Sequence, residues 1–340
     1  MKLIVLSKSD DYTVSGLIRY LIKMFYKESI IEIFNKRGIE IVTSKYIRDV
    51  IGKDEDVFLQ ELDPNEDCII LGIHPYGWRK AIDFGGSHTK VMWQDDLHYF
   101  SNYIDRKGVS VQRYSEKYDP PFIGRVDSLI TPSSIYFKNL GIVEYDEKIS
   151  DFFYFLDESI YDSIGIDGFF DRIEMVVLSG EVASGYDSRL EFDMLRQKKS
   201  FDGLIHKIPH PGYKDNEHMT EGRYYRELSK YRGAFVGHYV FPINFLLAKH
   251  IEVLMCGCLG FFEPNPLLEK QLGLIEYVHY VPCFENGALI KDDKFYRDWI
   301  SSKEGEAIAN RGKEYVRENF GNRYVEKLAD YLSGLKGQAS

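Results

Sequence analysis

The sequence lacks the features that mark several large classes of protein. No basic block is longer than Lys198-Lys199, and the 340 residues carry a net charge of −10. Because nucleic-acid binding depends on clustered Lys and Arg, we expect no nucleic-acid partner. No stretch approaches 18 uninterrupted apolar residues, so we expect no membrane span. With no signal peptide at the N-terminus and no N-x-S/T sequon, the sequence predicts a soluble protein of the cytoplasm, of the producing or host cell.

Cysteine is scarce, and its spacing excludes the usual cysteine-based sites. The chain has four cysteines, at positions 68, 256, 258 and 283, and they lie mostly inside apolar runs. The Cys256-Gly257-Cys258 spacing does not suit a zinc or redox pair, and no matching second pair exists. We therefore expect buried free thiols and not a set of disulfides.

The composition that remains is that of a globular protein of two domains. Hydrophobic residues make up 44% of the chain and charged residues 28%, without low-complexity runs. A length of 340 residues favours two domains over one. No internal repeat of about 20–50 residues is visible, which argues against a solenoid.

The chain opens with the strand–loop–helix–strand pattern of a doubly wound α/β domain. Residues 2–7 are apolar enough for a buried strand, residues 17–25 have helical periodicity, and residues 39–43 form the next strand. The loop after the first strand is not G-x-G-x-x-G, so a dehydrogenase-type dinucleotide site loses its main support. Further strands are expected at residues 68–72, 90–93 and 128–131.

The second half repeats this alternation and ends in helices. Strands are expected at residues 174–178, 204–208, 234–237 and 277–282, and helices at 221–231, 301–319 and 322–337. The acidic, aromatic segment 143–170 has the composition of a crossover between domains. The sequence thus predicts two Rossmann-like α/β domains, at 1–165 and 166–320, with residues 321–340 as a C-terminal helix that packs back on the first domain.

Residues 242–263 are the most informative stretch of the second half. Apolar residues recur at helical spacing up to Met255, Gly257 suits a left-handed helix cap, and residues 259–262 suit a buried strand. Lys249 and Glu252 lie three residues apart, on the helix face that we expect opposite the core. The alternative for these two residues is an exposed ion pair, which contributes little to stability.

This stretch resembles the donor-binding helix of GT-B-type glycosyltransferases, which carries a K/R-x-x-E-x-x-x-x-G pattern. Here the pattern is formed by Lys249, Glu252 and Gly257. The order of elements over roughly residues 170–335 is also similar, most of all to the compact group 1 and CgeB-like enzymes, including small ones carried by large DNA viruses. The resemblance implies two domains in the GT-B arrangement and a nucleotide-diphosphate sugar as donor substrate.

The resemblance also implies roles for residues in the second half. The departing diphosphate would be held by the backbone of Ser179-Gly180 and by the cations Arg189 and Lys249. Glu252 would accept hydrogen bonds from a ribose diol, and His210 and Tyr213 of the HPGY turn would flank the base. Two alternatives stay open: Arg189 pairs with Glu191 or Asp193 on its own helix, and HPGY is an ordinary β-turn.

Candidates for the catalytic base come from the first half, at the ends of expected strands. They are Asp96, His98 and His74, and each histidine could instead be structural. Nearby aromatic residues could stack on an acceptor sugar or belong to the core; they are Trp78, Trp93 and Tyr99. Asp95 and Asp96 are adjacent, and neighbouring strand residues point to opposite faces, so we expect no metal site and no cofactor.

The sequence therefore predicts a metal-independent hexosyl- or pentosyltransferase that acts on a glycan or glycoconjugate acceptor. An E-x₇-E pair counted from Glu252 is incomplete because Gly260 occupies its second position, which favours inversion over retention. The alternatives are a non-catalytic protein that binds a sugar or nucleotide, and a sugar-nucleotide epimerase of the same architecture. A phosphorylase would need a PLP lysine and a longer chain, so it ranks below these.

Overall fold

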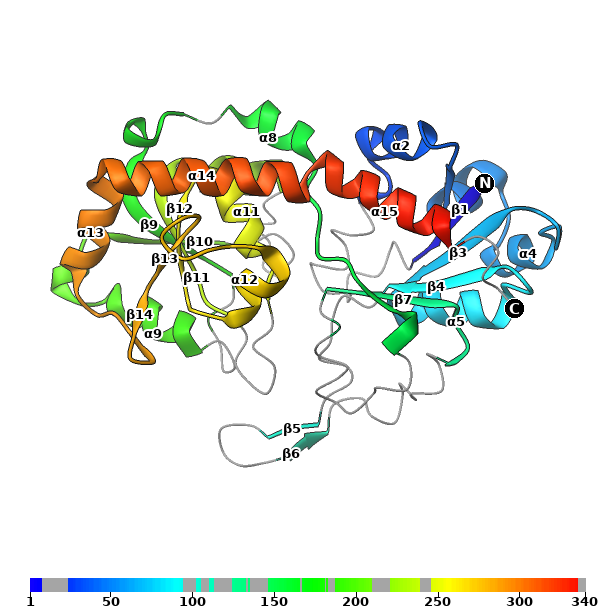
Figure 1. Ribbon diagram of the computed structural model, residues 1–340, viewed down its shortest axis with the longest axis horizontal. Coiled ribbons are helices and arrows are strands. Elements are labelled where there is room, and N and C mark those ends of the chain that lie inside the picture. Colours follow the sequence, from blue (N-terminus) through cyan, green and yellow to red (C-terminus); the bar gives the residue numbers. More distant parts are fainter. Residues whose placement is uncertain are drawn as a thin grey trace. The chain divides into compact units, whose positions relative to one another are not determined.

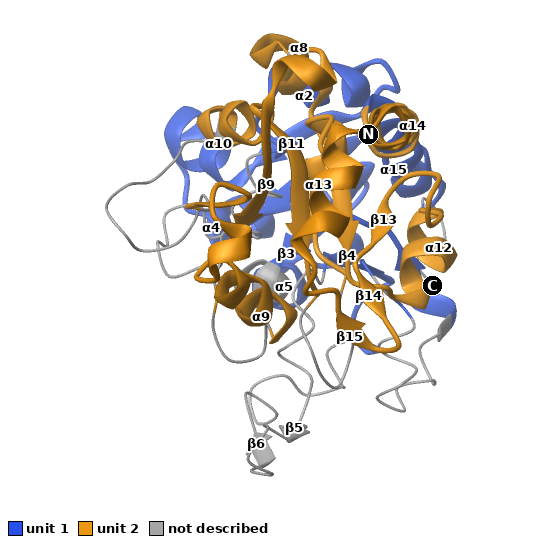
Figure 2. Cartoon of the chain, turned by 90° about the vertical axis from the view of Figure 1, so that its left-hand side faces the viewer, with its two compact units in different colours: residues 1–155, 322–340 blue, residues 156–321 orange. Residues whose placement is uncertain are grey.

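The computed structural model divides the chain into two compact units, shown in different colours in Figure 2. Unit 1 comprises residues 1–155 and 322–340, and unit 2 comprises residues 156–321. The structure describes residues 1–7, 24–93, 102–104, 110–112, 124–132, 134, 146–165, 167–180, 182, 187–209, 221–238 and 246–335. Within these ranges, the side chains of residues 74–78, 102–104, 110–112, 146 and 221 are not described.

Unit 1 is built on a six-stranded parallel sheet of order β2-β1-β3-β4-β7-β8 (Figure 1). Its central strands are rich in Ile, Leu and Val: β3 is buried along its whole length and β1 from Leu3 onward, as expected for a parallel sheet covered on both faces. The elements of unit 1 are β1 (Lys2–Leu6), α2 (Glu28–Asn35), β2 (Glu40–Thr43), α3 (Ser44–Tyr46), the π-helix η1 (Ile47–Ile51), α4 (Glu55–Gln60), β3 (Cys68–Ile73), α5 (His74–Phe84), β4 (Thr89–Trp93), β5 (Asn102–Ile104), β6 (Ser110–Gln112), β7 (Ser128–Thr131), the 3₁₀ helix η3 (Asp146–Lys148), β8 (Ile149–Asp151) and α15 (Asn322–Gly334).

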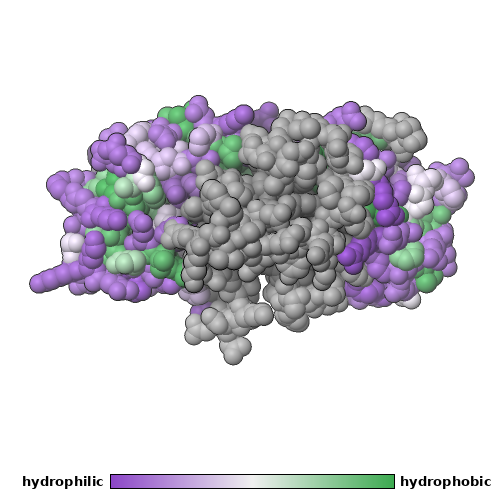
Figure 3. Space-filling model, turned by 90° about the horizontal axis from the view of Figure 1, so that it is seen from below, coloured by the Kyte–Doolittle hydropathy of each residue, from purple (hydrophilic) through white to green (hydrophobic). Residues whose placement is uncertain are grey.

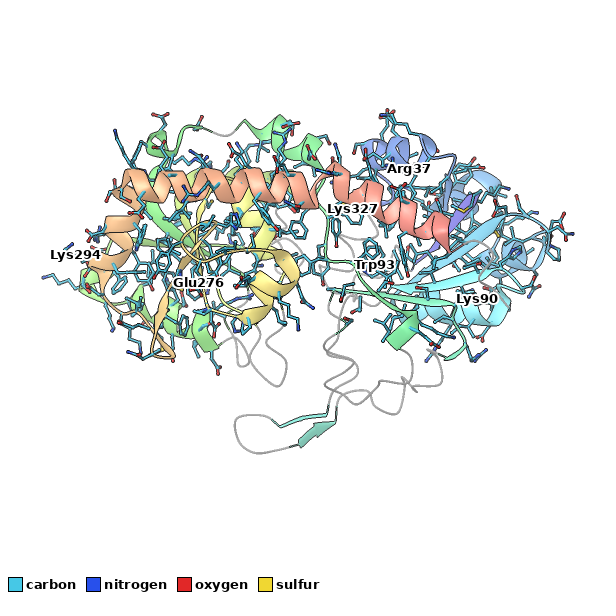
Figure 4. All side chains as sticks on the ribbon, viewed as in Figure 1. Arg37, Lys90, Trp93, Glu276, Lys294 and Lys327 are labelled. Atoms are coloured by element: carbon cyan, nitrogen blue, oxygen red, sulfur yellow. The ribbon has the colours of Figure 1, made fainter. Side chains whose placement is uncertain are left out.

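The C-terminal helix α15 is an integral part of unit 1. Its buried face packs on this unit, where the Tyr324 hydroxyl accepts a hydrogen bond from the Phe153 amide at 2.6 Å. Arg37, which follows α2, donates to Asp330 at 2.6 Å, and Figure 4 labels Arg37 close to this helix. Residues at the end of the chain therefore complete a unit that begins at its start.

Unit 2 is built on a five-stranded parallel sheet of order β10-β9-β11-β12-β13. Phe192 of α9 stacks on Phe235 of β11 with ring centroids 4.1 Å apart, and Tyr296 of α13 packs on the same cluster. The elements of unit 2 are α8 (Glu158–Ile164), η4 (Phe169–Asp171), β9 (Ile173–Ser179), α9 (Asp187–Leu195), η5 (Lys199–Phe201), β10 (Ile205–Ile208), α10 (Glu221–Leu228), β11 (Tyr231–Val236), α11 (Lys249–Met255), β12 (Leu259–Phe262), α12 (Pro266–Leu272), β13 (Val281–Pro282), β14 (Phe284–Glu285), β15 (Ala288–Leu289), α13 (Asp293–Ser301) and α14 (Lys303–Phe320).

Each parallel sheet contains a point where the strand order reverses. In unit 1 the reversal lies between β1 and β3, and in unit 2 it lies between β9 and β11. Ligands of open α/β sheets bind at such points, outside the carboxyl ends of the strands. In unit 2 the expected ligand position is therefore beside the residues that follow Ser179 and Val236, at the ends of β9 and β11.

The expected fold class is confirmed, since both halves are parallel α/β units and helices end the chain. The division between the units differs from the expected boundary at 165/166, because α8 belongs to unit 2. The physical reason is that Tyr161 of α8 packs its ring on Tyr225 of α10, 4.9 Å away. The expected strand at 277–282 is wrong for its first part: only Val281 and Pro282 are extended, after a turn.

The expectation of buried free thiols is also confirmed. All four cysteines are unoxidised and buried, and burial raises the pKa of Cys258 to about 11. In the described part of the chain, no helix has the length and apolar character needed to cross a membrane. On the face shown in Figure 3, the described residues are mostly hydrophilic, with smaller hydrophobic areas between them.

Candidate functional site

Two cations meet at the carboxyl end of β9, at the strand-order reversal of unit 2. Gly180 follows β9 with a φ of +103°, a conformation that suits glycine. A Cβ atom added there would lie 3.1 Å from Lys249 Nζ and 3.2 Å from Arg189 Nη1. The absence of a side chain at Gly180 thus leaves room for an ammonium and a guanidinium from two different helices.

Arg189 is held at the end of the neighbouring strand β11. It lies on α9, is 2% exposed, and donates from Nε and Nη2 to the Gly237 carbonyl at 3.3 and 3.2 Å. The alternative partners proposed on its own helix have other cations: Glu191 pairs with Lys291, and Asp193 with Arg196. The guanidinium is therefore fixed across the reversal point, between the ends of β9 and β11.

Lys249 begins α11 and is buried, which corrects the expected placement. Lys249 and Glu252 are each 6% exposed, so neither the face opposite the core nor an exposed ion pair describes them. Every residue of α11 is buried, because the helix packs on both β12 and α14. Burial, together with the positive charge of Arg189, lowers the pKa of Lys249 to about 7, with Glu252 opposing part of the shift.

Tyrosines of α10 anchor the remaining polar groups of this edge. The Tyr225 hydroxyl donates to Glu252 Oε1 at 3.2 Å, which orients the carboxylate. The Ser179 and Tyr224 hydroxyls are 2.8 Å apart, so the Ser179 side chain serves a structural hydrogen bond. What Ser179 can offer to a ligand is therefore its backbone, as the sequence suggested. Gly260, at the vacant Glu position, is an interior residue of the buried strand β12.

Sequence reasoning missed a histidine–carboxylate pair beside this cluster. His238 follows β11 and Glu263 follows β12; His238 Nε2 lies 3.4 Å from Glu263 Oε1, and the His238 amide donates to Glu263 Oε2 at 3.2 Å. Burial, together with the charge of Arg189, lowers the pKa of His238 to about 4, so its ring is neutral at pH 7. The signal was available: both residues lie within two positions of the end of an apolar strand, where ligands of parallel sheets bind.

We refer to Gly180, Arg189, Lys249 and Glu252 as the cationic cluster. It places two positive charges in a buried site, and burial of a charge is costly unless an opposite charge accompanies it. A ligand with two or more negative oxygens would satisfy both cations at once. The carboxylate of Glu252 lies about one helical turn beyond, positioned to accept hydrogen bonds from an attached polar group.

Several predicted site residues are not described. Asp96, His98, Tyr99, His210 and Tyr213 lie outside the described residues, as does Asp95. His74 and Trp78 lie on α5, which begins directly at the end of β3, and their side chains are not described. The structure thus leaves the predicted base and base-flanking turn as predictions.

Trp93, proposed to stack on an acceptor, belongs to the core of unit 1. It is the last residue of β4, is 0% exposed, and packs edge-on against Phe25 with ring centroids 6.4 Å apart. The Phe155 ring also packs against Trp93, with centroids 6.2 Å apart, and Figure 4 labels Trp93 at the end of its strand. The acceptor-stacking role is therefore wrong for Trp93, because its side chain is fully buried among other rings.

Comparisons with known proteins find relatives by structure only. No protein-family model matches the sequence, and no curated protein sequence matches it. An alpha-glucosyltransferase in complex with UDP-glucose and DNA containing an abasic site superposes with a TM-score of 0.63 at 12% identity, covering 98% of each chain.

Two further solved structures cover nearly the whole chain. Anabaena Alr3699/HepE in complex with UDP and glucose has a TM-score of 0.57 at 10% identity, over 98% of this chain and 100% of that one. Sucrose-phosphate synthase from Thermosynechococcus elongatus has a TM-score of 0.58 at 10% identity, over 100% of both chains. These likenesses establish the fold: the chain has the GT-B fold, with two parallel-sheet α/β domains and C-terminal helices.

Proposed function

We propose that the protein is a glycosyltransferase that moves a sugar from a nucleotide-diphosphate donor to an acceptor. The observation that carries the proposal is the convergence of Arg189 and Lys249 on Gly180, at the strand-order reversal of unit 2. Similar structures with the same fold were solved with UDP, UDP-glucose or UDP and glucose. Two buried cations fit the charge that develops on a departing diphosphate.

The residues of the cationic cluster would divide the donor between them. Arg189 and Lys249 bind the diphosphate oxygens, and Gly180 lets the backbone approach them closely. Glu252, oriented by Tyr225, accepts hydrogen bonds from the ribose hydroxyls. Because Arg189 is fixed to Gly237 before any ligand arrives, little reorganisation is needed when the negative charge builds up.

For the acceptor we keep the prediction of a glycan or glycoconjugate. The similar alpha-glucosyltransferase structures contain DNA, whereas this chain has a net charge of −10 and no basic block longer than two residues. A net negative charge without basic clusters does not suit a polyanionic acceptor. Metal independence, inversion and the base (Asp96, His98 or His74) are parts of the same proposal, and the likeness to the viral CgeB-like group is a prediction of the sequence.

A thermal-shift screen tests the donor site. UDP, GDP, CDP, ADP and dTDP are each added with Mg²⁺ or with EDTA, since a ligand that binds only the native state raises its melting temperature. We expect one diphosphate to stabilise the protein in EDTA, and Lys249→Gln to remove that stabilisation. Lys294→Gln is the matched control, because it removes an equal charge from an exposed helix of the same unit.

The alternatives give different results in the same experiments. Stabilisation that requires Mg²⁺ would overturn metal independence. Binding without slow hydrolysis of the matching nucleotide sugar would favour a non-catalytic binding protein, and interconversion of two nucleotide sugars would favour an epimerase. If no nucleotide stabilises the chain, the GT-B fold serves another ligand and the proposal fails.

A further inference from the structure

Unit 2 has a polar cavity at the opposite end of α11 from Lys249 of the cationic cluster. Its volume is about 170 Å³, and its lining residues are Glu158, Tyr161, Asp162, Gly165, Met255, Lys313 and Arg317. One water needs roughly 10–15 Å³ by this kind of measure, so a small molecule fits. Met255 ends α11 and Lys249 begins it, which separates this α8–α14 cavity from Lys249 by about 9 Å along the helix.

The carboxylates of the α8–α14 cavity already have a cation. Helices α8 and α14 lie side by side in Figure 1, and Arg317 of α14 donates to Glu158 Oε2 at 3.2 Å. The same guanidinium donates to both oxygens of Asp162, at 3.0 and 3.3 Å. Arg317 therefore holds the carboxylates of Glu158 and Asp162 against α14, and its own positive charge compensates part of theirs.

Lys313, one turn before Arg317 on α14, has no such partner. Among the residues that the structure describes, its ammonium forms neither an ion pair nor a hydrogen bond. Burial lowers its pKa, and so do the nearby positive charges of Arg172 and Arg317. Asp162 offsets part of the Lys313 charge but is itself paired with Arg317, so positive charge is in excess at the cavity wall.

A second positive charge, that of the Arg172 guanidinium, acts on Lys313. Arg172 is 7% exposed, and in the described part of the chain its guanidinium bonds only carbonyl oxygens: those of Asp167, Cys256 and Gly257. The carbonyls at the end of α11 offset part of this charge through the helix dipole. Lys313 and Arg317 line the cavity and Arg172 acts on Lys313 from beyond the lining residues, so three cations accompany the two carboxylates of Glu158 and Asp162.

We propose that the α8–α14 cavity binds a phosphate-type oxyanion. Lys313 is its principal ligand, and the nearby positive charge of Arg172 strengthens the attraction. An anion there removes the excess positive charge and gives the Lys313 ammonium a charge-assisted hydrogen bond. The cavity volume accommodates both a free phosphate and the phosphate group of a small phosphorylated metabolite. The site shares no residue with the cationic cluster, so the two can be tested separately.

The test measures phosphate binding by isothermal titration calorimetry on the full chain, with NaCl adjusted to constant ionic strength. It uses a Lys249→Gln background, because phosphate can also bind the cationic cluster. In that background we expect inorganic phosphate to bind, and Lys313→Gln to weaken it by about tenfold or more. Lys313→Arg should keep the affinity within about threefold. The control Lys303→Gln removes an equal charge from α14, about 15 Å along the helix.

Each outcome decides the proposal. Loss with Lys313→Gln alone supports it, and a glycerol phosphate titration then shows whether an esterified phosphate binds more tightly than the free ion. If phosphate does not bind in the Lys249→Gln background, or if Lys313→Gln acts no more strongly than Lys303→Gln, the proposal is overturned. A second readout needs no variant: phosphate should slow amine-reactive labelling of Lys313 but not of Lys303, and equal rates would contradict binding at this cavity.

Discussion

At the scale of single residues, Gly180 is the position of the candidate site where we expect a substitution to have the largest effect. Gly180→Ala would place a methyl group 3.1 Å from Lys249 Nζ, at a φ of +103° that L-residues rarely adopt. We expect a loss of about 1–3 kcal/mol in the free energy of unfolding. Affinity for the stabilising nucleoside diphosphate should fall by about tenfold or more, because the two cations must move. Urea unfolding and calorimetry measure the two effects.

The control for this variant is Gly222→Ala in α10. Gly222 has no atom near its absent side chain and no positive φ, so alanine fits and favours the helix by about 0.5–1 kcal/mol. Nucleotide affinity should stay unchanged in Gly222→Ala. Equal affinities in both variants would show that the space at Gly180 is not needed for binding.

The titration of Lys249 makes folding stability and diphosphate affinity depend on pH in opposite directions. Its pKa of about 7 lies below the usual 10.5, so between these values the unfolded chain binds more protons and this group makes stability rise with pH. Diphosphate binding needs the charged form, so affinity should fall by up to about tenfold per pH unit above 7. Titrations at pH 7.5–9.5 avoid the terminal phosphate, whose own pKa is about 6.

Lys249→Met should flatten both profiles, because it removes the titrating group without changing the volume much. If nucleotide affinity in the native chain does not change over this pH range, Lys249 does not contact the diphosphate. If the variant retains the pH dependence, another group titrates there. Lys294→Met, which removes an exposed charge, should leave both profiles as they are.

The same residues show what the sequence could and could not predict. The spacing of Lys249, Glu252 and Gly257 was enough to find the helix and its left-handed cap at φ +70°. It could not show that both charged side chains are buried, because α14, which contacts α11, comes more than forty residues later in the chain. Burial by distant segments leaves no trace in local periodicity.

At the scale of elements, the end of α11 depends on Gly257 and Arg172 together. Gly257→Ala would place a Cβ 2.7 Å from Nη2 of Arg172, whose Nη1 donates to the Cys256 and Gly257 carbonyls at the helix end. This steric cost adds to the cost of a positive φ. Gly203→Ala has a similar φ of +67° and no atom nearby. We expect Gly203→Ala to cost about 1–2 kcal/mol of unfolding free energy and Gly257→Ala at least about 1 kcal/mol more.

Chemical denaturation of the two variants measures the difference, and both glycines lie in unit 2. Equal losses would mean that Arg172 adapts without cost and does not fix the end of α11. A larger loss in Gly257→Ala would show that the guanidinium is a structural part of this helix. The Gly203 variant thus measures the cost of a positive φ alone, and the difference between the two variants gives the cost of the contact with Arg172.

Strands were easier to predict than helices in this chain. Runs such as Ile69–Leu71 are apolar throughout, and the parallel sheets bury them on both faces, so composition alone located them. The helix α12 and the hairpin β14–β15 were missed, because each is short and polar and depends on its neighbours. The unit boundary was misplaced because the aromatic contact between Tyr161 and Tyr225 joins segments that are distant in sequence.

At the scale of the whole molecule, unit 2 is contiguous in sequence and unit 1 is not. The cationic cluster lies entirely within unit 2, so a fragment of residues 156–321 should bind the nucleoside diphosphate with an affinity within about threefold of the full chain. Loss of binding in a folded fragment would show that unit 1 supplies donor contacts. Circular dichroism of the fragment provides the folding control.

Removal of residues 322–340 should damage unit 1 selectively. The deletion exposes the surface covered by Val325, Leu328 and Leu332, each of which is fully buried. We expect calorimetry to show loss of one transition, while nucleotide still raises the melting temperature of the other. Retention of both transitions would mean that unit 1 is stable without α15.

The discontinuity of unit 1 also affects how the protein folds during synthesis. Residues 1–155 leave the ribosome first but lack α15 until residues 322–334 have been translated. At about 5–20 residues per second, that delay is of the order of ten to thirty seconds. Unit 2 has all of its residues earlier and can be complete first, reversing the usual N-to-C order. The early half must therefore wait, with part of its core uncovered, for its own last helix.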